Sequence, residues 1–456
     1  MKSPLILLFI FVFLLASSVS SQTHIVIGWN DLGMHCSNKD FSTFVVLPPF
    51  NNIHAQVIQV GDINNPPVVV TTNMRVTYEI PGNTYSVGKT NFWDYAFAIF
   101  GANLAPNIGL TGVGLTGDLV IKENYFYVRG VPITPYTDAD LLNEDPFQLG
   151  LLKLYDQTDQ LLATAQPVVP VSNEINCVGS GCHSSAMAIL YQHGPEAGFD
   201  PNSKPILCAN CHASNALGMP GNPDLPSLSQ AVHEHHGGIT NDCYKCHPGP
   251  NTQCLRDIMS TKHGFVCQDC HGSVTQVGVS IGNGRIPWLQ EPSCGAVTTC
   301  HGPKYAEEPG KLFRESRGHG NLFCSACHGE PHAIVTSRVA RDNVQNIALQ
   351  GHAGTLDKCI VCHGIVPSGP GPHGILVSTC CLHPGDVNHN GIVNIQDVTY
   401  LIDFLYRNGH QPICQGGPGK YPEADANGNG TTNVQDISYV IKFLYLGGSA
   451  PICGPE

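Results

Sequence analysis

The sequence of 456 residues is poor in charge, and basic residues are the scarcer kind. Charged residues make up 12% of the chain, and 22 Lys and Arg against 35 Asp and Glu give a formal net charge of −13. Binding to a phosphate backbone depends on clustered basic side chains. This composition therefore excludes nucleic acid as the expected partner.

Long apolar runs are also missing, apart from "PLILLFIFVFLLA" close to the N-terminus. That run follows Lys2 and precedes "SSVSSQ", which is the pattern of a secretory signal over residues 1–21. A membrane anchor is the alternative, but the run is short for a span and ends in small polar residues. We expect a secreted protein, extracellular or at the cell surface, with no membrane span after signal cleavage.

Cysteine is nearly absent from residues 22–172, where Cys36 stands alone. Short stretches such as "THIVIGW", "HAQVIQV" and "DLVIKENYFYVRGV" alternate apolar and polar residues, and Gly, Pro and Asn separate them. This pattern predicts an all-β N-terminal domain of the sandwich type. Because the chain is long for a single domain, we expect a multidomain protein.

Residues 173–379 are rich in Cys and His and predict a loop-rich middle domain with short helices. Five exact C-x-x-C-H motifs lie here: Cys208/Cys211/His212, Cys243/Cys246/His247, Cys267/Cys270/His271, Cys324/Cys327/His328 and Cys359/Cys362/His363. In such a motif the two thiols form thioethers to a haem, and the adjacent histidine binds the iron as proximal ligand. Zinc is the alternative for C-x-x-C, but zinc does not require a histidine directly after every second cysteine.

Two further stretches keep the Cys-His ending but widen the gap between the thiols. They are "CVGSGCH" (Cys177, Cys182, His183) and "CGAVTTCH" (Cys294, Cys300, His301). With both included, motif histidines recur every 24 to 35 residues, whereas omitting His301 would leave one interval of 57. We therefore expect seven haem c groups, which supply the core that each short unit lacks. A disulfide remains the alternative for Cys294.

Histidines outside the motifs are more numerous than an ordinary surface requires. Eight are predicted to be distal iron ligands: His193, His233, His236, His263, His319, His332, His352 and His373. An iron whose two axial positions are both filled by histidine carries electrons rather than binding substrate. We therefore expect an electron-transfer protein rather than an enzyme.

The motifs "CANCH", "CYKCH", "CQDCH", "CSACH" and "CIVCH" resemble those of secreted multihaem c-type cytochromes of extracellular electron transfer, some of which polymerise into filaments. The resemblance implies that other cytochromes or extracellular acceptors are partners and that the chain self-associates. It also makes His35, in "GMHC", either a ligand to a neighbouring subunit's haem or a structural histidine beside a disulfide-bonded Cys36. Two alternatives stay open: an oxidoreductase with one open haem, similar to nitrite reductases, and a calcium-dependent cell-surface binding protein.

Residues 380–456 contain one pattern twice, 39 residues apart. The predicted calcium ligands are Asp386, Asn388, Asn390, Ile392 and Asp397 in the first copy, and Asp425, Asn427, Asn429, Thr431 and Asp436 in the second. Asp and Asn at alternate positions, with a carbonyl at the seventh, provide the oxygens that calcium prefers. Each loop precedes a stretch with helical apolar spacing, which predicts a small α domain.

This duplicated loop and helix resembles a dockerin, which implies two calcium ions and a cohesin-like partner. Ile395-Gln396 and Val434-Gln435 depart from the small hydroxyl residues that cellulosomal dockerins usually carry at these places. Six cysteines remain outside the haem motifs: Cys36, Cys254, Cys380, Cys381, Cys414 and Cys453. We expect disulfides among the last four, with three possible connectivities.

Overall fold

The computed structural model describes residues 23–175, 177–194, 198–249, 251–295, 301–302, 307–367, 371–374, 381, 383–388, 390–412 and 419–454. The predicted signal at residues 1–21 lies outside them. The described residues belong to two compact units, the first formed by Met1–Val60, Pro66–Glu291 and Ser325–Leu356, and the second by Gly61–Asn65, Pro292–Cys324 and Asp357–Glu456. Within the described ranges, none of the helices has the length and apolar character needed to cross a membrane.

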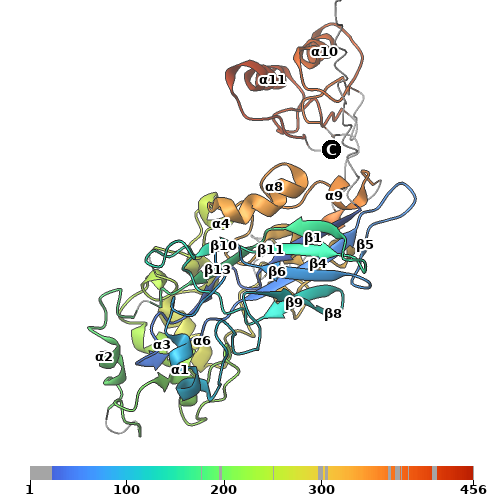
Figure 1. Ribbon diagram of the computed structural model, residues 1–456. Coiled ribbons are helices and arrows are strands. Elements are labelled where there is room, and N and C mark those ends of the chain that lie inside the picture. The colour runs from blue at the N-terminus through green and yellow to red at the C-terminus, as the bar shows by residue number, and fades with distance from the viewer. Residues whose placement is uncertain are drawn as a thin grey trace, which may run out of the picture. The chain divides into compact units, whose positions relative to one another are not determined.

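Two antiparallel sheets dominate the N-terminal part of the first unit (Figure 1). One has the strand order β1 (His24–Trp29), β4 (Asn52–Gln59), β9 (Tyr125–Arg129) and β8 (Val120–Lys122), with β5 (Val68–Val69) also paired to β4. The other has the order β12 (Leu161–Ala165), β11 (Leu151–Tyr155), β6 (Arg75–Glu79) and β7 (Thr116–Asp118). Side chains alternate between the faces of each strand, so one face of each sheet is apolar.

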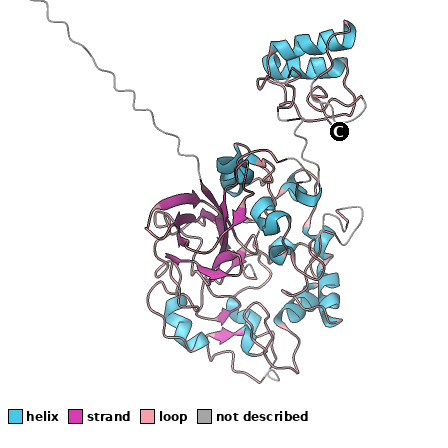
Figure 2. Cartoon of the chain, turned by 90° about the vertical axis from the view of Figure 1, so that its right-hand side faces the viewer, coloured by secondary structure: helices cyan, strands magenta, loops and turns pink. Residues whose placement is uncertain are grey.

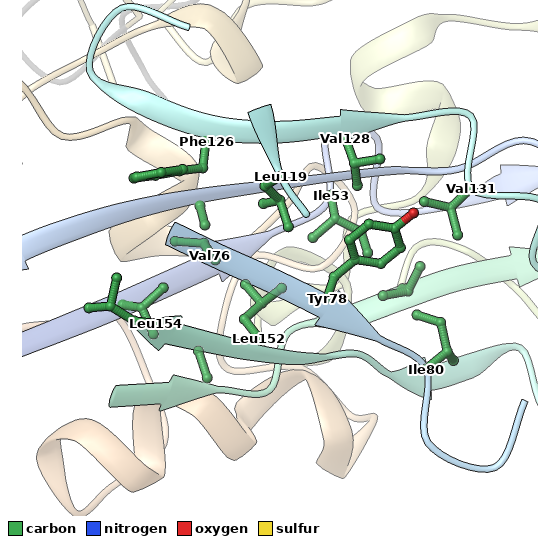
Figure 3. Close-up of a cluster of buried hydrophobic side chains, with 14 of the residues drawn as sticks. Ile53, Val76, Tyr78, Ile80, Leu119, Phe126, Val128, Val131, Leu152 and Leu154 are labelled. Carbon is green, nitrogen blue, oxygen red and sulfur yellow. The ribbon is translucent and has the colours of Figure 1, made fainter. Parts of the chain in front are cut away.

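The apolar faces of these two sheets form one core (Figure 3). Ile53 and Phe126 come from the first sheet, and Tyr78, Leu152 and Leu154 come from the second. Packing of two antiparallel sheets through such a core is the sandwich arrangement. The prediction of a β-rich N-terminal region is confirmed, although the helix α1 (Phe92–Phe100) was not expected there.

The first unit also contains two small sheets, and the second of them joins the β-rich region to the cysteine-rich region. The first has the order β10 (Phe147–Leu149), β13 (Val168–Ser172) and β2 (His35–Cys36). In the second, β3 (Phe44–Val45) pairs with β14 (Ile206–Leu207), directly before the motif that starts at Cys208. Ala209, inside that motif, belongs to the same buried cluster as Phe41 and Phe92.

Short helices carry the cysteine-rich region, as expected (Figure 2). They are α2 (Ala186–Leu190), α3 (Leu228–His236), α4 (Ile258–Thr261), α5 (Cys267–His271), α6 (Val274–Gly282), α7 (Cys324–His328), α8 (Val344–Gln350) and α9 (Ile360–His363). Single turns of 3₁₀ helix add Cys208–Asn210, Cys243–Lys245, Phe313–Glu315, His319–Asn321, Ala340–Asn343 and Pro372–Gly374. A Cβ on Gly278 would lie 2.9 Å from the Glu234 nitrogen, so α6 packs closely on α3 only because this residue is glycine.

The C-terminal part of the second unit contains α10 (Ile395–Tyr406) and α11 (Val434–Leu446). The side chains of Asn394 and Asn433 cap them by accepting hydrogen bonds from backbone N–H groups in the first turn. Leu401 and Val440 are fully buried in the cluster that joins the two helices. A disulfide links Cys381 to Cys453, which is one of the pairs left open by the sequence, while Cys380 and Cys414 lie outside the described residues.

Candidate functional site

The exact C-x-x-C-H motifs at Cys208, Cys243 and Cys359 each fold into one tight turn that a backbone hydrogen bond closes. The N–H groups of His212, His247 and His363 each donate to the carbonyl of the motif's first cysteine, at 2.9 Å. One turn therefore presents both thiols and the imidazole together. In the widened motif the His183 N–H also donates to the Cys177 carbonyl, at 3.2 Å, so its extra residues do not open the turn.

In three of the motifs the chain covers the first cysteine more than the second. Burial raises the pKa of the first cysteine to about 12 at Cys208 and to about 11 at Cys324. Cys177, Cys208 and Cys267 are half-buried, whereas Cys182, Cys211 and Cys270 are exposed. Cys324 and Cys327 are both half-buried, and burial raises the pKa of the second cysteine Cys362 to about 11. The protein itself therefore does not bury every motif cysteine, and we expect a haem to cover those that it leaves open. The thioether role of Cys211, Cys270 and Cys327 stays a prediction.

Five motif histidines face a second histidine from outside the motifs. The ring centroids are 6.0 Å apart for His183–His236, 6.1 Å for His212–His193, 5.8 Å for His247–His233, 6.0 Å for His271–His332 and 5.9 Å for His363–His319. All five second histidines belong to the predicted distal set. Two imidazoles on opposite sides of one metal, each bonded at about 2 Å, place their ring centroids about 6 Å apart.

Backbone carbonyls hold these rings in one orientation. The Nδ1 atoms of His233 and His236 lie 2.7 Å from the carbonyl oxygens four residues earlier, Ser229 and Val232. The Nδ1 of His212 lies 2.8 Å from the Pro226 carbonyl oxygen. Because a carbonyl only accepts, Nδ1 must carry the proton in each ring, which leaves the Nε2 lone pair for a metal.

Neutral imidazole is the form that binds a metal, and the surroundings of His247 and His332 favour it. Burial lowers the pKa of His247 to about 4, helped by His233 and His271, although part of the side chain remains open to solvent. Burial likewise lowers the pKa of His332 to about 4. These rings are therefore uncharged at neutral pH.

Helix α3 places two of the pairs next to each other. His233 and His236 are three residues apart and so point from the same face of the helix, one toward His247 and the other toward His183. The next two motifs also touch, because Gln268, which lies inside the motif that starts at Cys267, donates to the Cys243 sulfur at 3.8 Å. His332, which faces His271, lies four positions after the motif histidine His328. Neighbouring sites are thus linked through shared elements.

The remaining predicted ligands are not members of these five histidine pairs. The Gln350 side chain donates to the backbone carbonyls of His352 and Thr355 and so shapes the loop that contains them. The Thr355 hydroxyl lies 3.4 Å from His328 Nδ1. His301 and His263 are exposed. His373 lies in the turn Pro372–Gly374, and Cys300 falls outside the described residues. The iron-ligand roles of these residues stay predictions.

The structure favours the structural alternative for His35. Its side chain is buried, and its Nε2 lies 3.0 Å from Asp31 Oδ1, whose partner oxygen accepts from Asn52. Cys36 is a free thiol in β2, so the expected disulfide at this position is not seen. His35 therefore belongs to a buried network that the sequence pattern alone did not reveal.

The two C-terminal loops have nearly the same hydrogen bonds. In the first, Asp386 accepts from the N–H groups of Asn390 and Gly391 at 2.9 and 2.6 Å, and Asp397 accepts from Asn388 and Asn394 at 3.2 and 2.8 Å. The glycine has a φ of +86°, which a side chain would disfavour.

The second loop repeats this with Asp425 and Asp436. Asp425 accepts from the N–H groups of Asn429 and Gly430 at 3.1 and 2.7 Å, and Asp436 accepts from Asn427 and Asn433 at 3.1 and 2.8 Å. Burial raises the pKa of Asp397 and of Asp436, and the neighbouring Asp386 or Asp425 adds to the effect. Two buried carboxylates in one tight loop need a cation.

The dockerin type I family model matches residues 384–445. The chain therefore carries a C-terminal dockerin type I domain. Dockerin domains bind calcium, and the two loops fit two calcium ions. In this dockerin the apolar side chains of Ile395 and Val434 are half exposed at the positions where the sequence departs from cellulosomal members. No curated protein and no solved structure matches the chain.

Among the residues that the structure describes, no group of three or more His, Cys, Asp or Glu side chains is arranged to hold a metal ion. The two dockerin loops contribute two aspartates each, and the remaining predicted ligands are Asn side chains and backbone carbonyls. The histidine sites consist of facing pairs rather than clusters.

Proposed function

We propose that this protein is a secreted electron carrier with seven covalently attached c-type haems, and that its dockerin attaches it to a partner outside the cell. The match to the dockerin family supports the calcium-dependent attachment. The haem proposal is supported by the structure of the cysteine-rich region, and above all by the five histidine pairs about 6 Å apart.

The residues fit haem better than zinc. Zinc would draw the two thiols and the histidine of one motif onto one ion. Here the motif histidine instead faces a second histidine, with the Nε2 lone pair free wherever Nδ1 meets a carbonyl. The cysteines would hold the porphyrin through thioethers, and the paired histidines would bind the iron from both sides. A haem bound in this way supplies an iron that changes between ferrous and ferric states.

Filled axial positions support electron transfer over catalysis. A substrate needs a free position on the iron, and five of the seven motif histidines already face a second histidine. The linked neighbouring sites also suit a relay better than separate catalytic centres. We propose other cytochromes or extracellular electron acceptors as partners. An oxidoreductase with one open haem is the competing function, and His301 is the motif histidine whose second ligand is least defined.

Mass spectrometry of the intact secreted protein tests the haem proposal. Seven haem masses added to the chain are expected, and removal of one widened motif by Cys177→Ser and Cys182→Ser should lower the number by one. Five or six in the unmodified protein would exclude one or both widened motifs. A chain without covalent haem would refute the proposal. Spectra that show only low-spin haem are expected, whereas high-spin haem that binds nitrite would favour the enzyme.

The second candidate function is calcium-dependent binding at the cell surface, which the dockerin match favours. A cohesin-like domain is the proposed partner, and the half-exposed Ile395 and Val434 indicate that its contact surface is apolar at these positions. Calorimetry with a panel of cohesin domains, with calcium and with a chelator, tests this. Binding only in calcium is expected, and binding that persists in chelator would refute it.

We also propose self-association into a polymer. Because His35 is buried and bonded to Asp31, the contact between subunits would use other residues. Electron microscopy of the secreted protein distinguishes filaments from single molecules.

A further inference from the structure

The loop Asn30–Gly33, which follows β1 in the β-rich region, lies against the segment that carries His332. The Leu32 backbone carbonyl lies next to the His332 ring. The N–H of Asn30 donates to Glu330 Oε1 at 2.9 Å. The loop therefore contacts the ligand segment both at His332 itself and two residues before it.

Gly33 makes the closest of these approaches. Its φ is +71°, and a Cβ at this position would overlap the Pro331 carbonyl oxygen. Backbone groups move together, so no flexible side chain is available to relieve such an overlap. Glycine at this position therefore allows the loop to lie directly on the peptide that precedes His332.

Arg256 fixes the same two segments from the other side. Its Nη1 donates to the Gly33 carbonyl oxygen at 2.6 Å, and its backbone N–H donates to the His332 carbonyl oxygen at 2.9 Å. The guanidinium also forms a fully buried bidentate pair with Asp342. One residue thus holds both the loop and the backbone of the ligand.

Asn30 gives the loop its shape. Its Oδ1 accepts from the N–H groups of Leu32 and Gly33 at 3.0 and 3.1 Å. Its Nδ2 donates to the Asn52 carbonyl oxygen of β4 at 2.7 Å. The Leu32 carbonyl therefore has a defined direction set by the sheet below it.

We propose that the Asn30–Gly33 loop is a positioning element for an axial iron ligand: it fixes the His332 ring opposite His271 and directs its coordinating nitrogen at the iron. This inference rests on the proposed haem at His271. His332 has a φ of +67°, which is uncommon for a residue with a side chain and persists only where its surroundings enforce it. In the haem-loaded protein the Leu32 carbonyl would accept from the ring N–H, a bond that orients a ligand and strengthens its bond to the metal.

The test compares Gly33→Ala with Gly82→Ala in the full haem-loaded protein. Gly82 has a φ of +77° in the same region, but a Cβ there meets no atom within 4 Å, so the control matches the backbone strain without the overlap. The readouts are the haem number by mass and carbon monoxide binding to the reduced protein. His332→Ala, with and without added imidazole, serves as the reference for a lost ligand.

We expect the unmodified protein and Gly82→Ala to bind no carbon monoxide beyond the level of any haem that is already open. Gly33→Ala should bind one further carbon monoxide per chain with an unchanged haem number, as His332→Ala should, and imidazole should reverse the effect in His332→Ala. If Gly33→Ala binds no more than Gly82→Ala while His332→Ala gains one site, the positioning role is refuted and the haem proposal stands. If no variant holds haem, the proposed function itself fails.

Asn30→Ala is the second variant, because it loosens the loop without an overlap. A partial gain of carbon monoxide binding is expected. If Gly33→Ala is not exported, this variant decides the question, and an unchanged value refutes the inference. Failure of both variants to be exported would mean that the loop serves folding alone, which also refutes it.

Discussion

Loss of the Asp342 carboxylate should destabilise the first unit by about 3–5 kcal/mol, the usual penalty for removing one partner of a buried ion pair. Arg256 Nε and Nη2 lie 2.7 and 3.0 Å from the two Asp342 oxygens, and neither side chain has any exposed surface. In Asp342→Ala the guanidinium stays buried and keeps only its bonds to the carbonyls of Gly33 and Cys254. Because the site is buried, water does not replace the lost carboxylate as a partner of the guanidinium.

Urea unfolding of the haem-loaded protein, followed by far-ultraviolet circular dichroism, measures this change. The matched control is Asp159→Ala, because Arg75 lies 2.6 Å from Asp159 but both side chains are well exposed. Exposed pairs contribute about 1 kcal/mol or less. The two variants remove the same carboxylate from an arginine, so their difference isolates the effect of burial.

The double variant Arg256→Met with Asp342→Leu completes the argument. Removal of both charges should cost less than the sum of the single variants, because no unpaired ion remains. Some loss will persist, since the carbonyls of Gly33 and Cys254 each lose a donor at about 1–3 kcal/mol. If Asp342→Ala costs no more than Asp159→Ala, the reasoning on the buried pair is wrong.

Three further predictions concern the dockerin and the β-rich region. Leu401→Ala, at a fully buried position, should cost about 2–5 kcal/mol and unfold the dockerin in a thermal scan, while the haem spectrum stays unchanged. Calcium at 100 times its dissociation constant should stabilise the dockerin by about 2.7 kcal/mol, and Asp436→Ala should abolish the gain in the same scan. Burial would raise the pKa of Asp138, but hydrogen bonds from Lys89 and Thr84 outweigh it, so the pKa is lowered. Stability from this carboxyl is present above its unfolded pKa and is lost as the pH falls through the folded value, so Asp138→Asn should flatten the acid limb of a stability profile.

The sequence was most informative where chemistry fixes the spacing of residues. Cysteine pairs followed by histidine and the duplicated aspartates of the dockerin can be recognised without any structure, because each set must converge within a few residues. The β-rich region follows from alternation of apolar residues. The helix α1 was missed, since "FWDYAFAIF" is aromatic and apolar apart from Asp94 and resembles a buried strand as closely as a helix.

Contacts between distant segments could not be predicted in the same way. Arg256 and Asp342 are 86 residues apart, and Gln345 pairs with the backbone of Gly28 across 317 residues. Nothing local in the sequence marks either partner. In "GMHC" the sequence drew attention to His35, whereas the contacts with the histidine region come from the loop just before it.

Helical geometry nevertheless gives a physical reason for one choice, the prediction of His233 and His236 but not His235 as iron ligands. The stretch "HEHHGG" offers three histidines, and a helix over it places residues three apart on one face. His233 and His236 meet that condition, and each faces a motif histidine. The ring of His235 instead contacts its neighbour His236, and it points from another face of the helix. When one helix provides ligands to two irons, the three-residue spacing therefore indicates which histidines bind them. A third histidine in the same stretch is then not expected to be a ligand.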